Sequence, residues 1–184
     1  MARWLSKVSQ WQGCCINLKQ RPDAIDKLAL WLHTEWLKTR TDASMNPANA
    51  FSTRKKHLQK HIGHTQVPAT FLALSQKSLS SAVIGCVSLT RIASRNRKFQ
   101  QGLWVTNLFV VPTARAMGVG AALLRAAEVY AAEIGQSQLY LYTKSSQRYY
   151  QRLGWRTVID TTAGESERAG RPSGRIIMHK ALSF

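Results

Sequence analysis

Residues 103–134 read LWVTNLFVV, PTARAMGVG and AALLRAAEVYAAEI, and this stretch decides the fold. Its first part is apolar and rich in β-branched residues, a composition typical of a strand buried on both faces. Its last part is rich in helix formers with apolar residues at helical spacing, and Gly135 follows where a helix stop is expected. The sequence therefore predicts a strand, a glycine-containing turn and a helix, in that order.

The turn carries the pattern Arg115-x-x-Gly118-x-Gly120 directly before the helix. The first amides of a helix have no partner inside the helix and point outward at the positive end of its dipole. The two glycines let a ligand approach the backbone, and Arg115 adds a forked cation, so a pyrophosphate fits this place. In the alternative interpretation, the glycines only make a tight turn.

The same pattern, following an apolar strand and Pro112, resembles the acetyl-CoA motif of the GNAT superfamily of N-acyltransferases. Residues 147–155 read QRYYQRLGW and are similar to the second signature of that superfamily, an aromatic residue, Tyr-x-x-Leu-Gly and a second aromatic residue. The two motifs stand in the expected order and at a fitting separation. The resemblance covers roughly residues 16–182.

The fold class that follows is α/β (α+β), a GNAT-like mixed and mostly antiparallel central sheet with helices on both faces. The expected order is β-α-α-β-β-β-α-β-α-β-β, within a single domain at residues 1–184 whose residues 1–13 form an N-terminal extension. We expect strands at 14–18, 68–74, 82–89, 103–111, 139–143, 155–159 and 176–182, and helices at 22–38, 47–63 and 121–134 and in the second signature.

The resemblance implies that the pantetheine arm of acetyl-CoA lies along the strand at 103–111 like an added strand, with its pyrophosphate on the amides of residues 116–121. The cofactor site implied in this way consists of Phe109, Val110, Val111, Arg115, Ala116, Met117, Gly118, Val119, Gly120, Ala121, Thr143, Lys144, Gln147, Tyr150 and Arg152.

The implied reaction moves an acetyl group from acetyl-CoA to a primary amine of a small molecule, peptide or protein, by direct attack through a tetrahedral intermediate. Tyr150 is the expected general acid for the departing thiolate, because it occupies the tyrosine of the second signature. The alternative role for Tyr150 is a core aromatic residue that packs the short helix, as we expect for Tyr149.

The general base has no such counterpart. Many relatives place a glutamate on the central strand or its neighbour, whereas residues 103–111 contain no acid and no histidine. This departure leaves a water relay or a group from elsewhere in the chain, with His33 and Glu35 as candidates and His179 as a weaker one. The expected acceptor pocket includes His33, Glu35, Trp36 and Asn107; the alternatives are a surface position for His33 and Glu35 and a core position for Trp36.

Lys and Arg total 26 against 9 Asp and Glu, which gives a formal net charge of +17. Such a charge attracts polyanions. The basic residues are spread along the chain without the aromatic interleaving of a single-strand platform, so nucleic acid is possible as a partner but not favoured. A second hypothesis is a non-catalytic module that binds acyl-CoA or nucleic acid on the same fold.

The remaining composition excludes several protein classes. No apolar run approaches the ~20 residues of a membrane span, and the N-terminus lacks the apolar core of a signal peptide. The 3 cysteines lack the spacing of a metal site. We expect a cytoplasmic monomer or homodimer that uses acetyl-CoA and an amine acceptor, without a metal or a membrane.

Overall fold

The computed structural model describes residues 10–39, 47–92, 102–160 and 176–182. Within the expected extension at residues 1–13, residues 1–9 lie outside this description. The chain divides into two compact units. Unit 1 comprises Met1–Ser88 and Asn107–Ala126, and unit 2 comprises Leu89–Thr106 and Ala127–Phe184.

Seven strands pair in the order β1-β2-β3-β4-β5-β7-β6. The β4–β5 pair is parallel, whereas the β1–β2, β5–β7 and β6–β7 pairs are antiparallel. These pairings confirm the predicted mixed sheet. The strands are β1 (Cys15–Asn17), β2 (Ala69–Leu74), β3 (Val83–Arg91), β4 (Leu103–Val110), β5 (Gln138–Thr143), β6 (Arg156–Asp160) and β7 (Ile176–Ala181).

The helices occupy the intervals that the sequence predicts, and the order of strands and helices is the predicted one. They are α1 (Ile25–Thr39), α2 (Pro47–Lys60), α3 (Val119–Glu133) and α4 (Gln147–Arg152). The expected first turn of α1 is a separate 3-10 turn, Pro22–Ala24. Helix α3 begins at Val119, two residues earlier than its composition predicts, because the second glycine of the turn is already helical.

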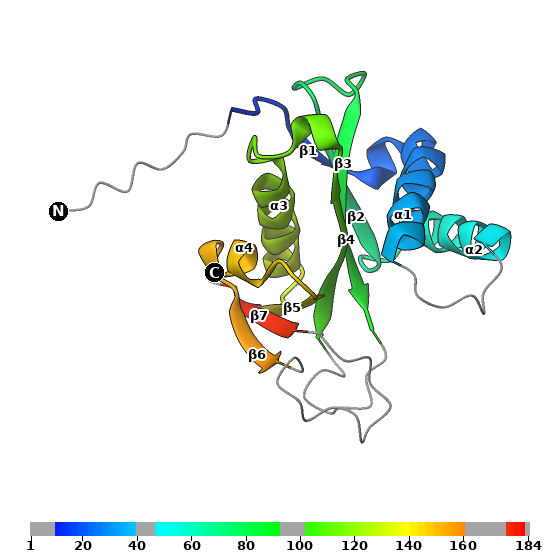
Figure 1. Ribbon diagram of the computed structural model, residues 1–184. Coiled ribbons are helices and arrows are strands. Elements are labelled where there is room, and N and C mark those ends of the chain that lie inside the picture. The colour runs from blue at the N-terminus through cyan, green and yellow to red at the C-terminus, as the bar shows by residue number, and fades with distance from the viewer. Residues whose placement is uncertain (1–9, 40–46, 93–101, 161–175, 183–184) are drawn as a thin grey trace. The chain divides into compact units, whose positions relative to one another are not determined.

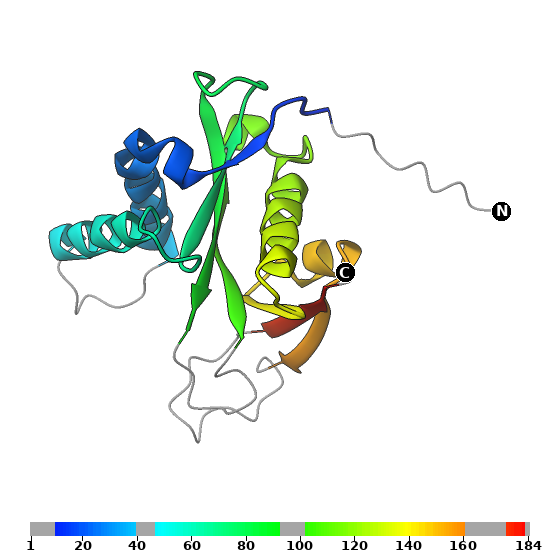
Figure 2. The ribbon, with the colours of Figure 1, turned by 180° about the vertical axis from the view of Figure 1, so that it is seen from behind.

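In unit 1, α1 and α2 lie side by side on one face of β2 and β3, and the first turns of α3 lie on the other face (Figures 1 and 2). One core cluster joins Leu28 and Leu32 of α1, Leu58 of α2, and Leu72 and Leu74 of β2. Full burial of such a side chain contributes about 1.5–3 kcal/mol, so this cluster holds the two helices on the sheet.

In unit 2, β7 lies between β5 and β6. The β5–β7 register runs from Gln138 opposite Ala181 to Thr143 opposite Ile176. A small core packs beside these strands, where the ring of Trp104 lies 5.5 Å from that of Tyr140. Helix α4 follows β5 after a short turn at residues 144–146. Among the helices that the structure describes, none has the length and hydropathy needed to cross a membrane.

Candidate functional site

The turn between β4 and α3 in unit 1 reverses the chain through two residues in the left-handed region. β4 ends at Val110, and the 3-10 turn Pro112–Ala114 follows. Ala116 and Gly118 then take φ angles of 62° and 91°. The amide of Ala122 donates to the carbonyl of Gly118 at 3.0 Å, so Gly118 accepts a helical hydrogen bond at the start of α3.

This turn has the features of an anion-binding turn. The amides of the first turn of α3 have no partner within the helix, and that turn carries no acidic side chain. Arg115 is exposed beside them, and its Nε donates to the carbonyl of Val110 at 3.0 Å. The bond holds the guanidinium at the end of β4. The residue types, backbone geometry and charge of the turn therefore suit a phosphate group.

Gly85 of β3 allows β4 and α3 to pack closely against β3 next to this turn, and sequence reasoning missed it. A Cβ atom at Gly85 would lie 2.8 Å from the carbonyl oxygen of Phe109 and 3.1 Å from Cδ1 of Leu123. Next to it, the amide of Val111 donates to the carbonyl of Ile84 at 2.9 Å, one residue beyond the end of β4. A glycine inside an apolar strand is the sequence signal for such a close approach.

His33 and Trp36 of α1 form a cluster with Phe51 and Arg54 of α2. The His33 ring lies 5.6 Å from the Trp36 ring and 5.5 Å from the Phe51 ring. The Arg54 guanidinium stands over the Trp36 ring at 5.5 Å, and its Nη1 lies 3.5 Å from Nδ1 of His33. Burial lowers the pKa of Arg54. His33 and Trp36 are both half-buried. The alternatives that the sequence left open were a surface position for His33 and a core position for Trp36.

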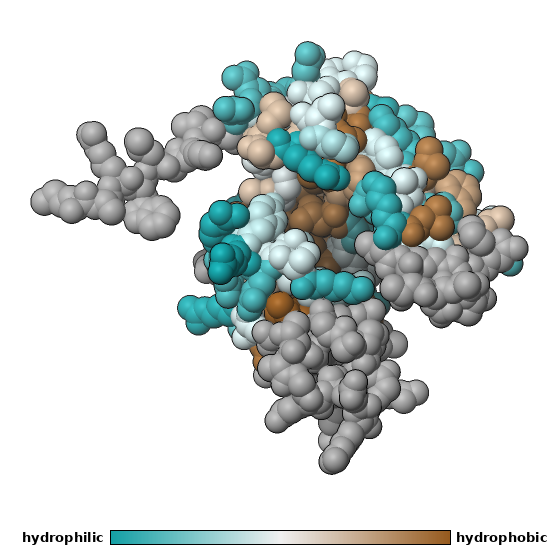
Figure 3. Space-filling model, viewed as in Figure 1, coloured by the Kyte–Doolittle hydropathy of each residue, from teal (hydrophilic) through white to brown (hydrophobic). Residues whose placement is uncertain are grey.

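Glu35 takes part in a surface ion pair. Its Oε1 lies 2.7 Å from Nζ of Lys38, and the two side chains are 39% and 63% exposed. Leu30 and Leu37 of the same helix are also exposed. Figure 3 shows hydrophobic side chains standing among hydrophilic ones over α1. The outer face of α1 is therefore solvent-facing and of mixed polarity.

Asn107 of β4 is exposed, as a residue of an acceptor pocket must be, and its backbone is unusual. Its φ angle is 55°, in the left-handed region although it lies within a strand. Its Nδ2 donates to Oγ of Ser88 at 3.2 Å, and the Sγ–H of Cys86 donates to its carbonyl at 3.4 Å. Neighbouring β3 thus holds Asn107 through both its side chain and its main chain.

In unit 2, Tyr150 lies on α4 between two aromatic rings. The ring of Tyr149 is 5.2 Å away and that of Trp155 is 6.3 Å away, both in T-shaped arrangements. Burial, followed by the neighbouring Tyr149, raises the pKa of Tyr150 to about 12. The phenol is therefore protonated at neutral pH and can donate a proton.

The other predicted residues of unit 2 divide into turn-forming and exposed ones. Thr143 is buried, and its Oγ1 accepts the amide of Ser146 at 3.0 Å. Nε2 of Gln147 donates to Oγ1 of Thr157 at 2.9 Å. Lys144 and Arg152 are exposed cations. Thr143 and Gln147 thus shape the connection into α4, while the two cations are accessible to solvent.

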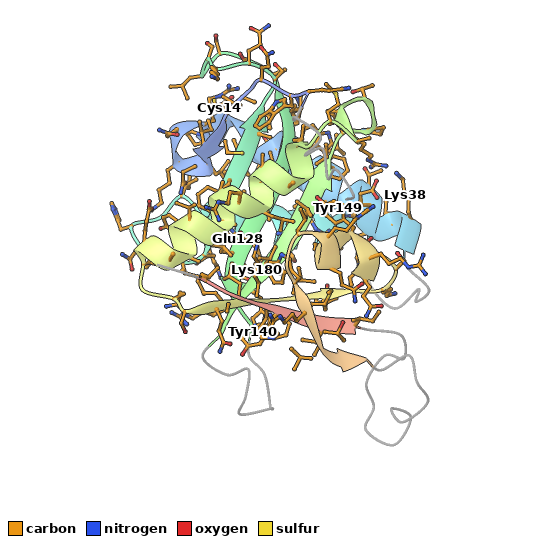
Figure 4. All side chains as sticks on the ribbon, turned by 90° about the vertical axis from the view of Figure 1, so that its left-hand side faces the viewer. Cys14, Lys38, Glu128, Tyr140, Tyr149 and Lys180 are labelled. Atoms are coloured by element: carbon orange, nitrogen blue, oxygen red, sulfur yellow. The ribbon has the colours of Figure 1, made fainter. Side chains whose placement is uncertain are left out.

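Lys180 supports the end of α4, and sequence reasoning did not single it out. Its Nζ lies 2.8 and 2.9 Å from the two carboxylate oxygens of Glu128 and donates to the carbonyl of Leu153 at 2.8 Å. The Lys180 and Glu128 side chains lie next to each other in Figure 4. A lysine in the mostly apolar strand at residues 176–181 was the available signal, because a charge there needs a partner.

The predicted site residues thus fall into two sets. Unit 2 holds Thr143, Lys144, Gln147, Tyr150 and Arg152. Unit 1 holds His33, Glu35, Trp36, Asn107, Phe109, Val110, Val111, Arg115, Ala116, Met117, Gly118, Val119, Gly120 and Ala121. Within the described ranges, no group of three or more His, Cys, Asp or Glu side chains could hold a metal ion.

Solved acetyltransferase structures resemble the chain in fold. A GNAT-family acetyltransferase from Streptococcus pneumoniae is 16% identical with a TM-score of 0.63, over 93% of this chain and 100% of that chain. A structure from Salmonella typhimurium, described with its cofactor acetyl-CoA, is 15% identical with a TM-score of 0.61, over 94% and 95% of the two chains. The N-acetylglutamate synthase of Neisseria gonorrhoeae, complexed with coenzyme A and N-acetyl-glutamate, is 18% identical with a TM-score of 0.62, over 92% of this chain and 35% of that chain.

These identities are low, so the likeness shows the fold alone. No curated protein sequence matches the chain. The sequence model described as the Acetyltransferase (GNAT) family matches residues 27–155, which include both motifs. The match spans more than half of the 184 residues. The turn from β4 to α3, the order of the strands and this match lead to one conclusion: the chain belongs to the Acetyltransferase (GNAT) family.

Proposed function

We propose that the chain is an acetyl-CoA-dependent N-acetyltransferase whose acceptor is a primary amine of a small molecule, peptide or protein. The observation that carries this proposal is the anion-binding turn at the start of α3, in a chain of the GNAT family. The acetyl-CoA named for the Salmonella typhimurium structure supports the choice of acyl donor.

In this proposal, acetyl-CoA is a substrate held mainly by the backbone. Its amides pair with the main chain of Phe109–Val111, as an added strand does. The amides of residues 116–121 receive the pyrophosphate, and Arg115, Lys144 and Arg152 offset its charge. The exposure of these three cations supports that role. Thr143 and Gln147 shape the turn that carries Lys144.

The proposed chemistry is direct transfer. The amine nitrogen forms a bond to the thioester carbonyl carbon, and the carbon–sulfur bond breaks as the tetrahedral intermediate collapses. The thiolate that leaves takes a proton from the hydroxyl of Tyr150, which is protonated at neutral pH because burial raises its pKa to about 12. A backbone amide near Val110 polarises the carbonyl oxygen.

The amine must also lose a proton, because an alkylammonium has a pKa near ~10. Strand β4 reads LWVTNLFV and contains no acid or histidine that could take this proton. Water is therefore the proposed acceptor of this first proton, and the second proton that the nitrogen loses as the amide forms restores the hydroxyl of Tyr150. The four candidate pocket residues, His33, Glu35, Trp36 and Asn107, would bind and orient the amine.

The test is turnover with a panel of four amines: L-glutamate, glycinamide, spermidine and the peptide Ser-Ala-Glu-Ala. Release of free thiol from acetyl-CoA, measured with and without each amine, gives the rate of transfer. We expect amine-dependent thiol release with at least one of them. Because the chain is strongly basic, the acidic amines are favoured over spermidine.

The lack of a carboxylate on β4 favours one alternative, a non-catalytic module that binds acyl-CoA or nucleic acid. Acetyl-CoA binding without turnover of any amine would support the first form. Binding of DNA or RNA that persists above about 0.2 M salt would support the second, whereas loss of binding below that concentration indicates only diffuse attraction.

A further inference from the structure

A chain of buried polar side chains crosses unit 1 and ends at Asn107. His61 follows α2, and its Nδ1 lies 2.8 Å from Oγ1 of Thr70 on β2. The same Oγ1 lies 2.8 Å from Oγ of Ser88 on β3. Oγ of Ser88 in turn accepts Nδ2 of Asn107 on β4 at 3.2 Å. Four side chains from four successive segments are thus connected by three hydrogen bonds.

This hydrogen-bonded chain of side chains has one buried end and one exposed end. His61 is 5% exposed, and Thr70 and Ser88 are completely buried, whereas Asn107 is exposed. Burying a hydroxyl costs about 1–3 kcal/mol unless it is hydrogen-bonded, and apolar residues would fill the same space without that cost. The effect of this hydrogen-bonded chain of side chains is felt at its exposed end, where it fixes the position of the side-chain amide of Asn107.

The chain also has a direction. The Nδ2 group of Asn107 can only donate, so Oγ of Ser88 accepts from it, which leaves the Ser88 proton available for Thr70. With Ser88 as the donor to Thr70, the Thr70 hydroxyl has its own proton available for Nδ1 of His61. A neutral imidazole is required at this end, and burial lowers the pKa of His61 to about 4. His61 is therefore neutral at pH 7, and in the tautomer protonated at Nε2 its Nδ1 acts as the final acceptor.

This direction determines which atom Asn107 presents to solvent. Its Nδ2 is engaged by Ser88, and among the described residues no hydrogen bond reaches its Oδ1. The main chain of Asn107 has a φ angle of 55°, and its carbonyl accepts a hydrogen bond from the thiol of Cys86. A non-glycine residue kept in the left-handed region costs about 1–3 kcal/mol and is typical of functional sites.

The position of Asn107 matches this chemistry. It lies two residues before Phe109 on the strand proposed to pair with the donor. A fixed, exposed carbonyl oxygen accepts an N–H group, and a primary amine carries such groups. We propose that His61, Thr70 and Ser88 are positioning residues that hold Asn107 so that its Oδ1 receives an N–H of the amine acceptor. This inference rests on the proposed function.

The kinetic test uses the best amine of the four-amine panel. Asn107→Gly removes the amide and keeps a backbone that tolerates the positive φ angle, and Ser88→Ala removes the link behind it. Ser52→Ala, on the exposed face of α2, is the control. We expect both site variants to raise KM for the amine at least tenfold and to leave KM for acetyl-CoA within twofold, with no change for the control.

A spectroscopic test reports the direction without any turnover. The nitrogen-15 shifts of the His61 ring distinguish a protonated from an unprotonated Nδ1, and the His61→Gln spectrum assigns the signal. We expect an unprotonated Nδ1 at pH 7. A protonated Nδ1 overturns the inference, because Thr70 would then accept and the chain would run the other way.

The outcomes separate the inference from the proposed function. An active parent whose amine KM is the same in Ser88→Ala and Asn107→Gly overturns the inference and leaves acetyl transfer standing. A parent that turns over none of the four amines overturns both. A raised amine KM with an unprotonated Nδ1 of His61 supports the inference in full.

Discussion

Lys180 and Glu128 form a nearly buried ion pair that joins β7 to α3 within unit 2. The Lys180 Nζ lies 2.8 Å from one carboxylate oxygen, and the Glu128 side chain is only 5% exposed. The same ammonium group donates to the carbonyl of Leu153, three residues after Tyr150. The Lys180 side chain therefore connects β7 to α3 and to the residue that follows α4, the helix that carries the proposed general acid Tyr150.

The pair gives a first prediction on stability. Lys180→Met removes the ammonium group that pairs with the buried carboxylate of Glu128, and removing one partner of a buried ion pair typically costs about 3–5 kcal/mol. We expect a loss near the lower bound in the free energy of unfolding from urea denaturation, because Lys180 is 23% exposed. Adding Glu128→Gln should recover part of the loss.

Lys38→Met is the matched control, since Lys38 pairs with Glu35 on the exposed face of α1. An exposed pair contributes about 0–1 kcal/mol. If the Lys180 and Lys38 variants lost the same free energy of unfolding, the Lys180–Glu128 pair would contribute no more to stability than an exposed ion pair.

Gly85 gives a second prediction. In Gly85→Ala, the new Cβ meets the backbone carbonyl of Phe109 at 2.8 Å, and a backbone atom cannot move aside as a side-chain end can. Overpacking of this kind costs about 1–3 kcal/mol. The free energy of unfolding from urea denaturation measures the loss. Thr53→Ala, on the exposed face of α2, should change this free energy by less than about 0.5 kcal/mol. An unchanged free energy of unfolding for Gly85→Ala would mean that β3 and β4 are not in close contact.

A third prediction concerns Tyr150. Tyr150→Phe keeps the ring between Tyr149 and Trp155 but removes the proton that the thiolate needs. We expect kcat to fall at least tenfold, with KM for acetyl-CoA within twofold, because general acids contribute about 10²–10⁴-fold. Tyr149→Phe is the matched control and should keep most of its kcat. Equal kcat values for the Tyr150 variant and the parent would remove Tyr150 from the mechanism.

A fourth prediction follows from His61. Burial, opposed by a hydrogen bond with the backbone of Ala69 and reinforced by the charge of His57, lowers its pKa from 6.5 to about 4. Between these two pH values, the unfolded chain binds a proton that the folded chain refuses. Stability is therefore present above pH 6.5 and is lost as the pH falls toward 4, by at most about 3 kcal/mol.

The measurement compares the free energy of unfolding at pH 7.5 and pH 4.5. His61→Gln should lose less stability between these pH values than the parent. His57→Gln, on exposed α2, should keep nearly all of the parent's pH dependence. The same pH dependence in His61→Gln and the parent would contradict the lowered pKa.

Much of the fold could be predicted because its signals are local. The apolar run at 103–111, the glycine turn and the alanine-rich helix are contiguous, and β4 and α3 lie where these patterns place them. Helix α3 starts two residues early because Val119 and Gly120 already have helical partners, which composition alone does not show.

The site was less predictable because its supports come from distant parts of the chain. Lys180 and Glu128 are 52 residues apart, and Asn107 and Ser88 are 19 residues apart. Neither pairing leaves a pattern that a single sequence displays. The positive φ angle of Asn107 is also not indicated by the sequence, because the residue at this position is not a glycine. The sequence alone predicted Asn107 and Tyr150 as candidate site residues, but it did not predict the residues that contact and position them.

The central claim is that the turn at the start of α3 binds acetyl-CoA, and calorimetric titration tests it most directly. Gly120→Glu places a carboxylate in the first helical turn, where it suits the helix dipole but repels a pyrophosphate. Gly120→Gln adds similar bulk without the charge. We predict micromolar binding by the parent, weaker binding by Gly120→Gln and none by Gly120→Glu. Equal affinity in the parent and Gly120→Glu, or no binding by the parent, would contradict the account.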